Sequence, residues 1–259
     1  MILADLHTHS GFSVDGRDSM AALCSGALAA GLDVLCVTDH YDDYSTFVPA
    51  DYMASFERTR DAYAGRLDFL FGVELGEGHL SRKASGDLTG TLPFDFVLGS
   101  CHHLDGQPDF YYLEYQGESH CRSLVRRYLD ELLRMIAWGG FDVLGHLTYP
   151  ARYMEERGYD NIAFPEEETR EVLRGLVERG LGLEVNLSGL RRGQDASPNL
   201  QLLKLYRACG GEIVTVGSDA HTAAHVGAGI AEGYELLSAA GFSHVALYHA
   251  RKPEFVRIG

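Results

Sequence analysis

Residues 1–10 read MILADLHTHS and residues 34–40 read VLCVTDH, and these two stretches show the pattern that organises the chain. Each is a short apolar run, typical of a buried strand, that ends in histidines and acids. Later runs end in the same way, in GVE at Glu74, GSCHH at His102, GHL at His146, and SDAH at Asp219 and His221. Because these polar residues follow separate strands, the sequence predicts one shared polar site at one edge of a sheet.

Strand-like and helix-like segments alternate along the chain. The expected strands cover residues 2–6, 34–38, 69–75, 94–100, 143–146, 183–187 and 213–217, with an eighth candidate at 245–248. Amphipathic stretches predict helices at 20–30, 52–64, 121–137, 168–179, 200–209 and 229–240. Continuous apolar strands separated by helices indicate a parallel sheet that is buried on both faces. Since candidate ligands follow nearly every strand, a TIM-like α/β barrel fits better than an open sheet with one switch point. We expect a single domain over residues 1–259, with its active site at the C-terminal ends of the strands.

Local signals support these boundaries. Asp18 and Ser19 can cap the helix that begins near Met20, and Gly31 lies where that helix should end. The longest segments without a clear pattern, at 76–92 and 105–119, follow the third and fourth strands. Both segments are therefore expected over the barrel mouth, as candidate substrate lids.

Composition excludes several classes of partner. The chain has 37 acidic and 22 basic residues, a formal charge of -15, which disfavours a polynucleotide because phosphate backbones need a basic track. No apolar run approaches the roughly 18 residues that a membrane span needs, and the N-terminus does not resemble a signal peptide. Five scattered cysteines without a CxxC pair indicate a reducing compartment. We expect a cytoplasmic enzyme with a small-molecule substrate, no polynucleotide partner and no membrane partner.

The motif residues are typical of metal ligands. His7 and His9 occupy alternate positions of an extended segment, so both imidazoles project to one side and can bind one ion. The preceding Asp5 is either a carboxylate that orients a histidine or a cap for the following turn. Histidine and carboxylate ligands without thiolates suit Zn, Mn or Fe. Because there are too many ligands for one four-coordinate ion, we expect two or three ions and hydrolysis of a phosphoester.

The motifs DLHTHS, VTDH, GVE, SCH, GHL and SDAH, in this order, resemble the PHP (polymerase and histidinol phosphatase) superfamily. The resemblance implies a distorted (β/α)7 barrel with a trinuclear metal centre. Carried over by motif, one ion is bound by His7, His9, Glu74 and Asp219, a second by Glu74, His102 and His146, and a third by Asp15, His40 and His221. Some members have histidine in place of Asp15, whose alternative role is that of a turn residue in VDG. The SxH spacing of the family selects His102 rather than His103.

Other residues are candidates for binding the substrate. Arg191 and Arg192, in NLSGLRRG, would neutralise phosphate oxygens, and the resemblance favours Arg191. His225 is a candidate general acid or phosphate ligand. The alternative for all three is a solvated surface position. The histidines that match no ligand motif are expected on the surface or in packing contacts, at His79, His120, His244 and His249.

Within this superfamily, the segments NLSGLR and GGEIVTVGSDAH most resemble those of the histidinol-phosphate phosphatases of histidine biosynthesis. The implied reaction converts L-histidinol phosphate and water to L-histidinol and phosphate. An acidic mouth, with Asp42, Asp43 and Glu114 as candidate partners, would suit the amine and imidazole of that substrate. The alternatives are a PHP nuclease or small-nucleotide phosphoesterase, and a metal-binding accessory domain without turnover.

Overall fold

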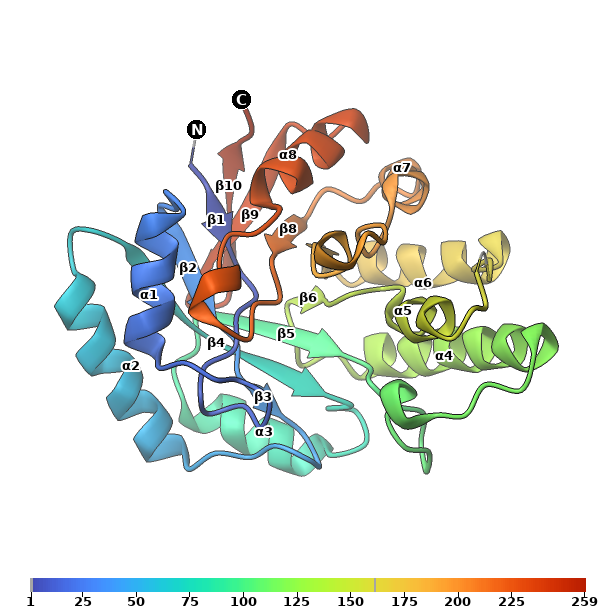
Figure 1. Ribbon diagram of the computed structural model, residues 1–259, viewed down its shortest axis with the longest axis horizontal. Coiled ribbons are helices and arrows are strands. Elements are labelled where there is room, and N and C mark those ends of the chain that lie inside the picture. The colour runs from blue at the N-terminus through green and yellow to red at the C-terminus, as the bar shows by residue number, and fades with distance from the viewer. Residues whose placement is uncertain (1, 161) are drawn as a thin grey trace.

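The computed structural model describes residues 2–160 and 162–259, and its centre is a nearly closed parallel barrel (Figure 1). The strands are β1 (Ala4–Asp5), β2 (Val34–Val37), β3 (His40–Tyr41), β4 (Asp68–Gly76), β5 (Phe96–Ser100), β6 (Val143–Leu144), β7 (Gly182–Asn186) and β8 (Val214–Gly217). They lie in the order β1-β2-β4-β5-β6-β7-β8, and β3 continues from β2 beside β4. The barrel closes where Leu6 N donates to Val216 O at 3.0 Å. The expected seven-unit α/β barrel is confirmed.

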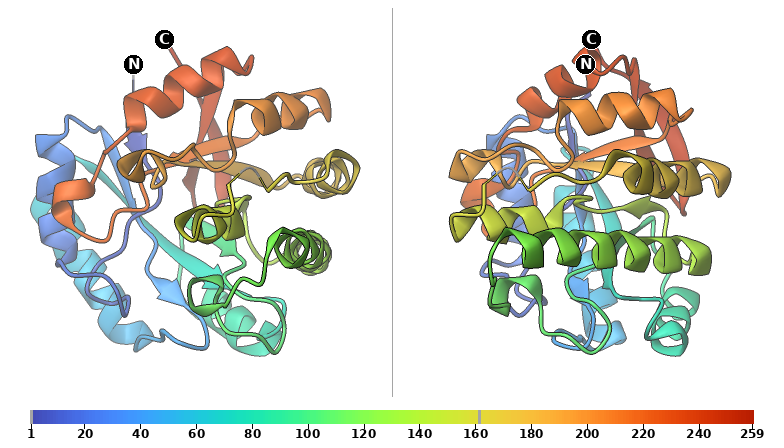
Figure 2. Two further views of the ribbon diagram at one scale, coloured as in Figure 1. Left: turned by 45° about the vertical axis from the view of Figure 1, so that its right-hand side comes forward. Right: turned by 90° about the vertical axis from the view of Figure 1, so that its right-hand side faces the viewer.

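Helices surround the barrel (Figure 2). They are α1 (Met20–Ala29), α2 (Pro49–Tyr63), α3 (Arg82–Thr91), α4 (Glu118–Trp138), α5 (Tyr149–Glu156), α6 (Glu166–Glu178), α7 (Leu200–Ala208) and α8 (Ile230–Ala239). Three short 3-10 helices are η1 (Phe110–Tyr112), η2 (Leu190–Arg192) and η3 (Ala223–His225). The Ser19 side chain caps α1 by accepting from Ala22 N at 3.2 Å, and Gly31 follows the helix with a φ of +73°. Asp18 instead accepts from Ala223 N, which ties the start of α1 to η3.

The alternation of side chains along the strands divides the core into two layers. In β2, Leu35 and Val37 belong to the large cluster between the sheet and the helices, whereas Val34 and Cys36 belong to a smaller cluster. Successive side chains of a strand point to opposite faces, so the smaller cluster is the barrel interior. Its members are Ala4, Leu6, Val34, Cys36, Leu70, Phe96, Leu98, Val143, Ala246, Leu247 and Tyr248.

The eighth candidate strand exists but does not join the parallel sheet. Residues 245–248 lie in β9 (His244–His249), which pairs antiparallel with β10 (Lys252–Arg257) in a separate two-stranded sheet. The chain reverses at Ala250 and Arg251, whose φ angles of +48° and +61° are left-handed. The turn is held because both main-chain N–H groups donate to Asp95 and the Arg251 guanidinium binds Asp142. The hairpin thus contributes β9 side chains to the barrel interior without joining the parallel sheet.

One expectation about the connecting segments needs correction, and one helix was not predicted. Residues 76–92 are not irregular, because they contain α3, whose buried residues are only Ser85 and Leu88. Residues 149–156 form α5, which the sequence reading missed although its spacing is helical and it buries Tyr149 and Tyr153. Among the described residues, no helix is long and apolar enough to span a membrane.

Candidate metal centre

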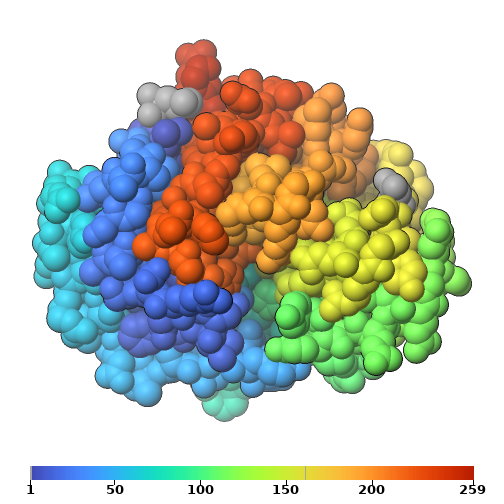
Figure 3. Space-filling view, viewed as in Figure 1, coloured from blue at the N-terminus to red at the C-terminus, as the bar shows by residue number. Residues whose placement is uncertain are grey.

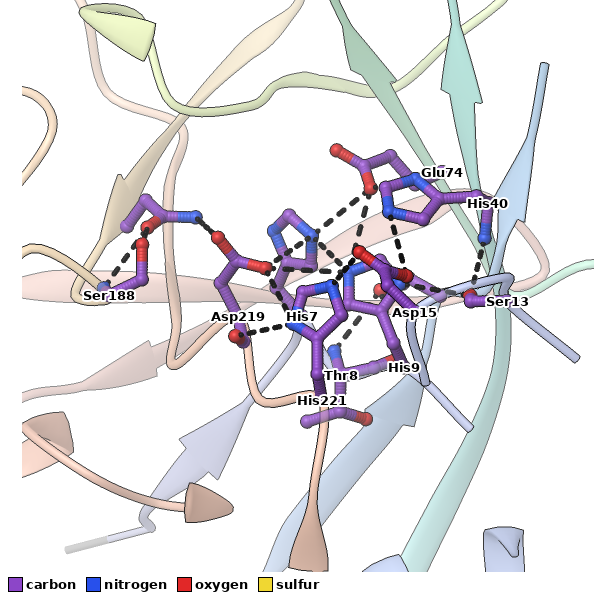
Figure 4. Close-up of polar contacts among 12 residues, drawn as sticks. His7, Thr8, His9, Ser13, Asp15, His40, Glu74, Ser188, Asp219 and His221 are labelled. Carbon is purple, nitrogen blue, oxygen red and sulfur yellow. Dashed lines mark hydrogen bonds and ion pairs between the residues drawn. The ribbon is translucent and has the colours of Figure 1, made fainter. Parts of the chain in front are cut away.

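Strand pairings bring the predicted ligands together (Figure 4). A parallel bridge joins Thr8 to Ala220, so the histidines that flank Thr8 lie beside the acid and the histidine that flank Ala220. Next along the sheet, His40 of β3 pairs with Glu74 of β4. The segments after β5 and β6 supply His102 and His146. Eight of the nine predicted ligands therefore lie at the C-terminal ends of the strands, where parallel barrels place their active sites, and Asp15 lies in the turn between β1 and α1.

The most buried group contains His7, His9, Asp219 and one oxygen of Glu74. His7 Nε2 lies 3.0 Å from His9 Nε2 and 3.4 Å from Glu74 Oε2. Asp219 Oδ1 lies 3.5 Å from His9 Nε2 and 3.8 Å from His7 Nε2. Two ligands of a tetrahedral Zn²⁺ with bonds of about 2.0–2.1 Å are about 3.4 Å apart. These separations match that spacing.

The second group uses the other oxygen of Glu74. Glu74 Oε1 lies 2.9 Å from His146 Nε2 and 3.4 Å from His102 Nε2, and it accepts from Ser100 Oγ at 2.5 Å. The neighbouring His103 turns away, because its ring contacts Glu77 Oε2 at 3.2 Å and Leu104 O at 3.0 Å. The two oxygens of one buried carboxylate thus face two separate sets of imidazoles.

A third group lies nearer to solvent. His221 Nε2 is 2.9 Å from Asp15 Oδ2, and His40 Nε2 is 3.7 Å from Asp15 Oδ1. The His9 ring stacks on both imidazoles, with centroid distances of 4.3 Å to His40 and 4.2 Å to His221. Asp15 therefore contacts the two histidines that the family resemblance pairs with it.

Two features show that these residues fit bound cations. His40 Nδ1 and Glu74 Oε2 are buried 2.9 Å apart, yet within the described parts of the chain neither atom has a hydrogen-bond partner. Burial and positive charge on His221 and His40 lower the pKa of His9 to about 3, so its imidazole is a neutral donor at physiological pH. Although burial lowers it, the pKa of His102 is raised to about 10 by the Glu74 carboxylate. A bound divalent cation would replace the proton on an imidazole such as that of His102 and would supply the positive charge beside Glu74.

Buried carboxylates that the sequence reading missed support the ligands. Glu184 lies 2.6 Å from His7 Nδ1, and Glu77 accepts from the main-chain N–H groups of His102 and His103. Asp39 accepts from Ser13 Oγ at 2.6 Å, and that oxygen lies 3.2 Å from His9 Nδ1. Their only sequence signal is an acid within or next to an apolar run.

Asp5 has the second of the two roles that the sequence left open. Its carboxylate accepts from Ser218 N at 2.8 Å, from Gly227 N at 2.9 Å and from His7 N at 3.3 Å. It bonds to main-chain groups and to Ser218 Oγ, and to no imidazole nitrogen among the described residues. Asp5 therefore fixes the turns that carry the ligands.

A cavity of about 640 Å³ opens above the cluster. Figure 3 shows the surface hollowed between the N-terminal segment, the segment after β8 and the segment that precedes α4. The predicted substrate residues Arg191, Arg192 and His225 all line this cavity, together with Arg17, Tyr111 and Arg152. Arg191 donates to Ser218 O at 2.5 Å and to Asp219 O at 3.0 Å, whereas Arg192 pairs with Glu156 at 3.6 Å.

Arg152 is the cationic residue that the sequence reading missed. Its side chain is 12% exposed, and its Nη2 lies 3.5 Å from Asp219 Oδ2 and contacts Ser188 Oγ. The guanidinium carbon lies over the rings of Tyr149 and Tyr153, at 5.5 and 5.9 Å from their centroids. The helical spacing of α5 was the available signal, because it places Arg152 next to this aromatic pair.

Asp42, Asp43 and Glu114, the acids expected at the mouth, do not line this cavity. Asp42 accepts from Tyr44 N and Ser45 N in its own turn, and its carboxylate lies near the ring nitrogens of His40 and His102 at the edge of the cluster. The acids that do line the cavity belong to the ligand groups, and the remaining charged lining is arginine. The overall charge of -15 therefore does not describe the local charge at the site.

The sequence profile of the PHP domain matches residues 5–188, which include seven of the nine predicted ligands. The chain belongs to the PHP family. Two curated relatives match nearly the whole chain. The probable histidinol-phosphatase of Thermotoga maritima is 29% identical over 248 residues, 95% of each chain. The histidinol-phosphatase of Lactococcus lactis is 28% identical over 257 residues, 96% of this chain and 95% of that protein.

Two solved structures share the fold of this chain. The crystal structure of the Lactococcus lactis histidinol phosphate phosphatase, complexed with Zn, L-histidinol and phosphate, superposes with a TM-score of 0.83 at 24% identity, over 97% of this chain and 98% of that chain. A second crystal structure, of the putative histidinol phosphatase from Listeria monocytogenes, has a TM-score of 0.76 at 18% identity, over 88% of this chain and 99% of that chain. These likenesses establish the fold.

Proposed function

We propose that this PHP protein is a metal-dependent phosphomonoester hydrolase that converts L-histidinol phosphate and water to L-histidinol and phosphate. The observation that carries the proposal is the buried Glu74 carboxylate, whose two oxygens face two sets of imidazoles beneath an arginine-lined cavity. Relatives named histidinol-phosphatase over about the same length support the choice of substrate.

We assign three cation sites to the ligand groups. His7, His9, Asp219 and Glu74 Oε2 would hold one ion, and Glu74 Oε1, His102 and His146 would hold a second. Asp15, His40 and His221 would hold the third. Nitrogen and oxygen donors without thiolates suit Zn, Mn or Fe. Bound cations of this kind lower the pKa of water and offset the charge of phosphate oxygens.

The arginines of the cavity would bind the phosphate group. A phosphomonoester carries two negative charges at neutral pH, and a guanidinium can donate two parallel hydrogen bonds to its oxygens. Arg152 is the strongest candidate because burial and aromatic contacts hold its guanidinium beside Asp219. Arg191 is bonded to two main-chain carbonyls, so it acts from a fixed position. Arg192 is half-exposed and shares its charge with Glu156.

The leaving alkoxide needs a proton, and His225 is our candidate donor. It ends η3 and lines the same cavity as the arginines. A positioned acid of this kind contributes typically 10²–10⁴-fold to the rate. His225 lies outside the ligand groups, so it is free to exchange a proton with the substrate.

The side of the cavity formed by η1 and α5 would bind the organic part of the substrate. Tyr111 is 52% exposed and lies edge-on to Tyr153, with ring centroids 5.6 Å apart. Aromatic faces of this kind bind flat rings and cations, which suits an imidazole and its neighbouring amine. The segment that carries Tyr111 is one of the two predicted lids, and this role remains a prediction.

The test is phosphate release by the protein reconstituted with Zn or Mn. L-Histidinol phosphate should be hydrolysed with a kcat/KM at least roughly 100-fold above that for glycerol phosphate or a nucleoside monophosphate, because glycerol phosphate offers the tyrosine wall no ring and a nucleoside monophosphate offers it no cationic amine. Equal rates on all three would leave a phosphatase of another substrate class. Bound metal without turnover on any phosphoester would favour the accessory-domain alternative.

We further propose that the enzyme works in the cytoplasm, in amino-acid biosynthesis. Its five cysteines are all free thiols, and four of them are buried. Free thiols at these positions are typical of a reducing compartment.

A further inference from the structure

Glu184 links two of the ligand groups through one buried carboxylate. It lies in β7, and its side chain is 1% exposed. Its Oε1 is 2.6 Å from His7 Nδ1, and its Oε2 accepts from the main-chain N of His146 at 2.8 Å. His7 belongs to the first ligand group and His146 to the second. Among the described residues, the only other carboxylate that contacts both groups in this way is the bridging Glu74 itself.

The local structure makes room for this contact. Gly217 of β8 lies next to Glu184, and a Cβ there would come within 2.5 Å of Glu184 Oε1 and 2.4 Å of His7 Cβ. Only glycine therefore allows the carboxylate to reach the imidazole. On its other side, Glu184 binds the N–H of His146, whose φ of +21° is a value that residues with a side chain rarely adopt.

We propose that Glu184 is a positioning residue: it keeps the proton of His7 on Nδ1, so that the Nε2 lone pair faces the cation site, and it holds His146 in its unusual backbone conformation. This inference rests on the ligand assignment of the proposed function. A neutral imidazole has one N–H and one lone pair, so the group that accepts at Nδ1 decides what Nε2 can do. Carboxylates hydrogen-bonded to metal-binding histidines act in this way, and their loss typically costs 10–100-fold in metal affinity.

The substitution Glu184→Gln separates this role from simple packing, because an amide has one acceptor and one donor end. If the amide oxygen stays on the His146 N–H, its NH₂ meets His7 Nδ1 and donates to it. His7 then carries its proton on Nε2 and loses the lone pair that faces the ligand group. If the amide is turned round, its NH₂ meets the His146 N–H and two donors face each other. Neither orientation satisfies both histidines.

The chain offers a matched control in a second buried Glu–His pair. Glu131 of α4 is 3% exposed and lies 2.5 Å from His79 Nε2, and neither residue lines the active-site cavity. Glu131→Gln makes the same chemical change at a similar depth. Both variants should lose thermal stability, but only the Glu184 variant should change metal binding.

The experiment measures bound zinc by mass spectrometry after equilibration at fixed free Zn²⁺, together with kcat and KM. Glu184→Gln should need roughly 10–100-fold more free Zn²⁺ to fill the cluster. Its loss of turnover should fall on kcat and should be partly restored by added Zn²⁺. Glu131→Gln should match the parent protein in zinc binding and in turnover. Wild-type zinc binding in Glu184→Gln, or an equal loss in both variants, would overturn the proposal.

Nitrogen NMR of the histidine side chains provides a test that needs no substrate and no variant. In the zinc-loaded parent protein, His7 should carry its proton on Nδ1, and a proton on Nε2 would overturn the proposal even if Glu184→Gln fails to fold. The metal and NMR measurements stay decisive if the protein does not hydrolyse L-histidinol phosphate. A parent protein that binds no divalent metal would instead contradict the proposed function.

Discussion

The ligand cluster has a buried half and an exposed half, and the two are built differently. The side chains of His7, His9 and Glu74 are at most 1% exposed. Those of Asp15 and His221 are 53% and 30% exposed. In the buried half, strand registry and buried acids fix each imidazole before any cation binds. In the exposed half, Asp15 comes from a solvent-facing turn, so binding there must also order the side chain. The buried sites should therefore bind metal more tightly than the rim site.

The largest effect should follow from Glu74→Ala. Removing the carboxylate takes one ligand from each buried group and leaves imidazoles facing one another, so bound metal should fall by at least two equivalents. Turnover should fall by roughly 10³-fold or more, because metal stabilisation of the transition state is worth several kcal/mol. Metal analysis measures the bound equivalents, and phosphate release measures the turnover. Unchanged metal content would show that Glu74 does not bridge two sites.

The next effect concerns the arginines, which show the same contrast of burial and exposure. Arg152→Met should lower kcat/KM by roughly 10–100-fold, because a hydrogen bond to a charged partner is worth about 1.5–3 kcal/mol. Arg192→Met should lower it by only about threefold, because its exposed charge is screened and shared with Glu156. Steady-state kinetics with L-histidinol phosphate test the pair. A larger loss in Arg192→Met would place the phosphate at the rim of the cavity.

The rim site itself should be the weakest part of the cluster. Asp15→Ala should remove one equivalent of metal, leave the other sites filled, and lower turnover by roughly tenfold. Asp15→His should keep the third equivalent, since imidazole is an equally suitable donor. Equilibrium dialysis against zinc resolves the stoichiometry. Loss of all metal in Asp15→Ala would mean that the buried sites are not independently formed.

The last prediction concerns metal affinity rather than turnover, through the pH dependence of metal uptake. Although burial lowers it, the pKa of His40 is raised to about 9 by Glu74, and that of His102 is raised to about 10. In the protein without cations these histidines hold protons below those values, so acid favours the metal-free form. Zinc affinity should therefore rise from pH 6 to pH 8, by up to about tenfold per pH unit for each proton displaced. Calorimetry in two buffers of different ionisation enthalpy counts the protons, and pH-independent affinity would contradict the charges assigned here.

The sequence predicted what short-range spacing determines. Alternate residues of an extended segment placed His7 and His9 together, and the SxH spacing that the family resemblance supplied selected His102, rather than His103, which does lie beside Glu74. Parallel strands have their C-terminal ends on the same side of the barrel, so residues after separate strands were expected to meet, and they do.

What the sequence did not reveal depends on the three-dimensional arrangement. In the sequence, Glu184 is a single acid within an apolar strand. Its contact with His7 depends on Gly217 of the adjacent strand, which leaves room for the carboxylate. Arg152 could be assigned to the cavity only once the position of α5 was known. The net charge is a sum over the whole chain, so it did not reveal the local group of arginines that lines the cavity. The terminal hairpin was missed because its left-handed turn is formed by Ala250 and Arg251 rather than by glycine or asparagine.

The most direct test titrates the stripped protein with zinc and follows phosphate release from L-histidinol phosphate against the number of bound ions. Activity should be absent without metal and appear as the two buried sites fill, with a smaller further gain as the rim site fills. Full turnover in the metal-free protein, or none with two or three ions bound, would contradict a hydrolase built on this cluster.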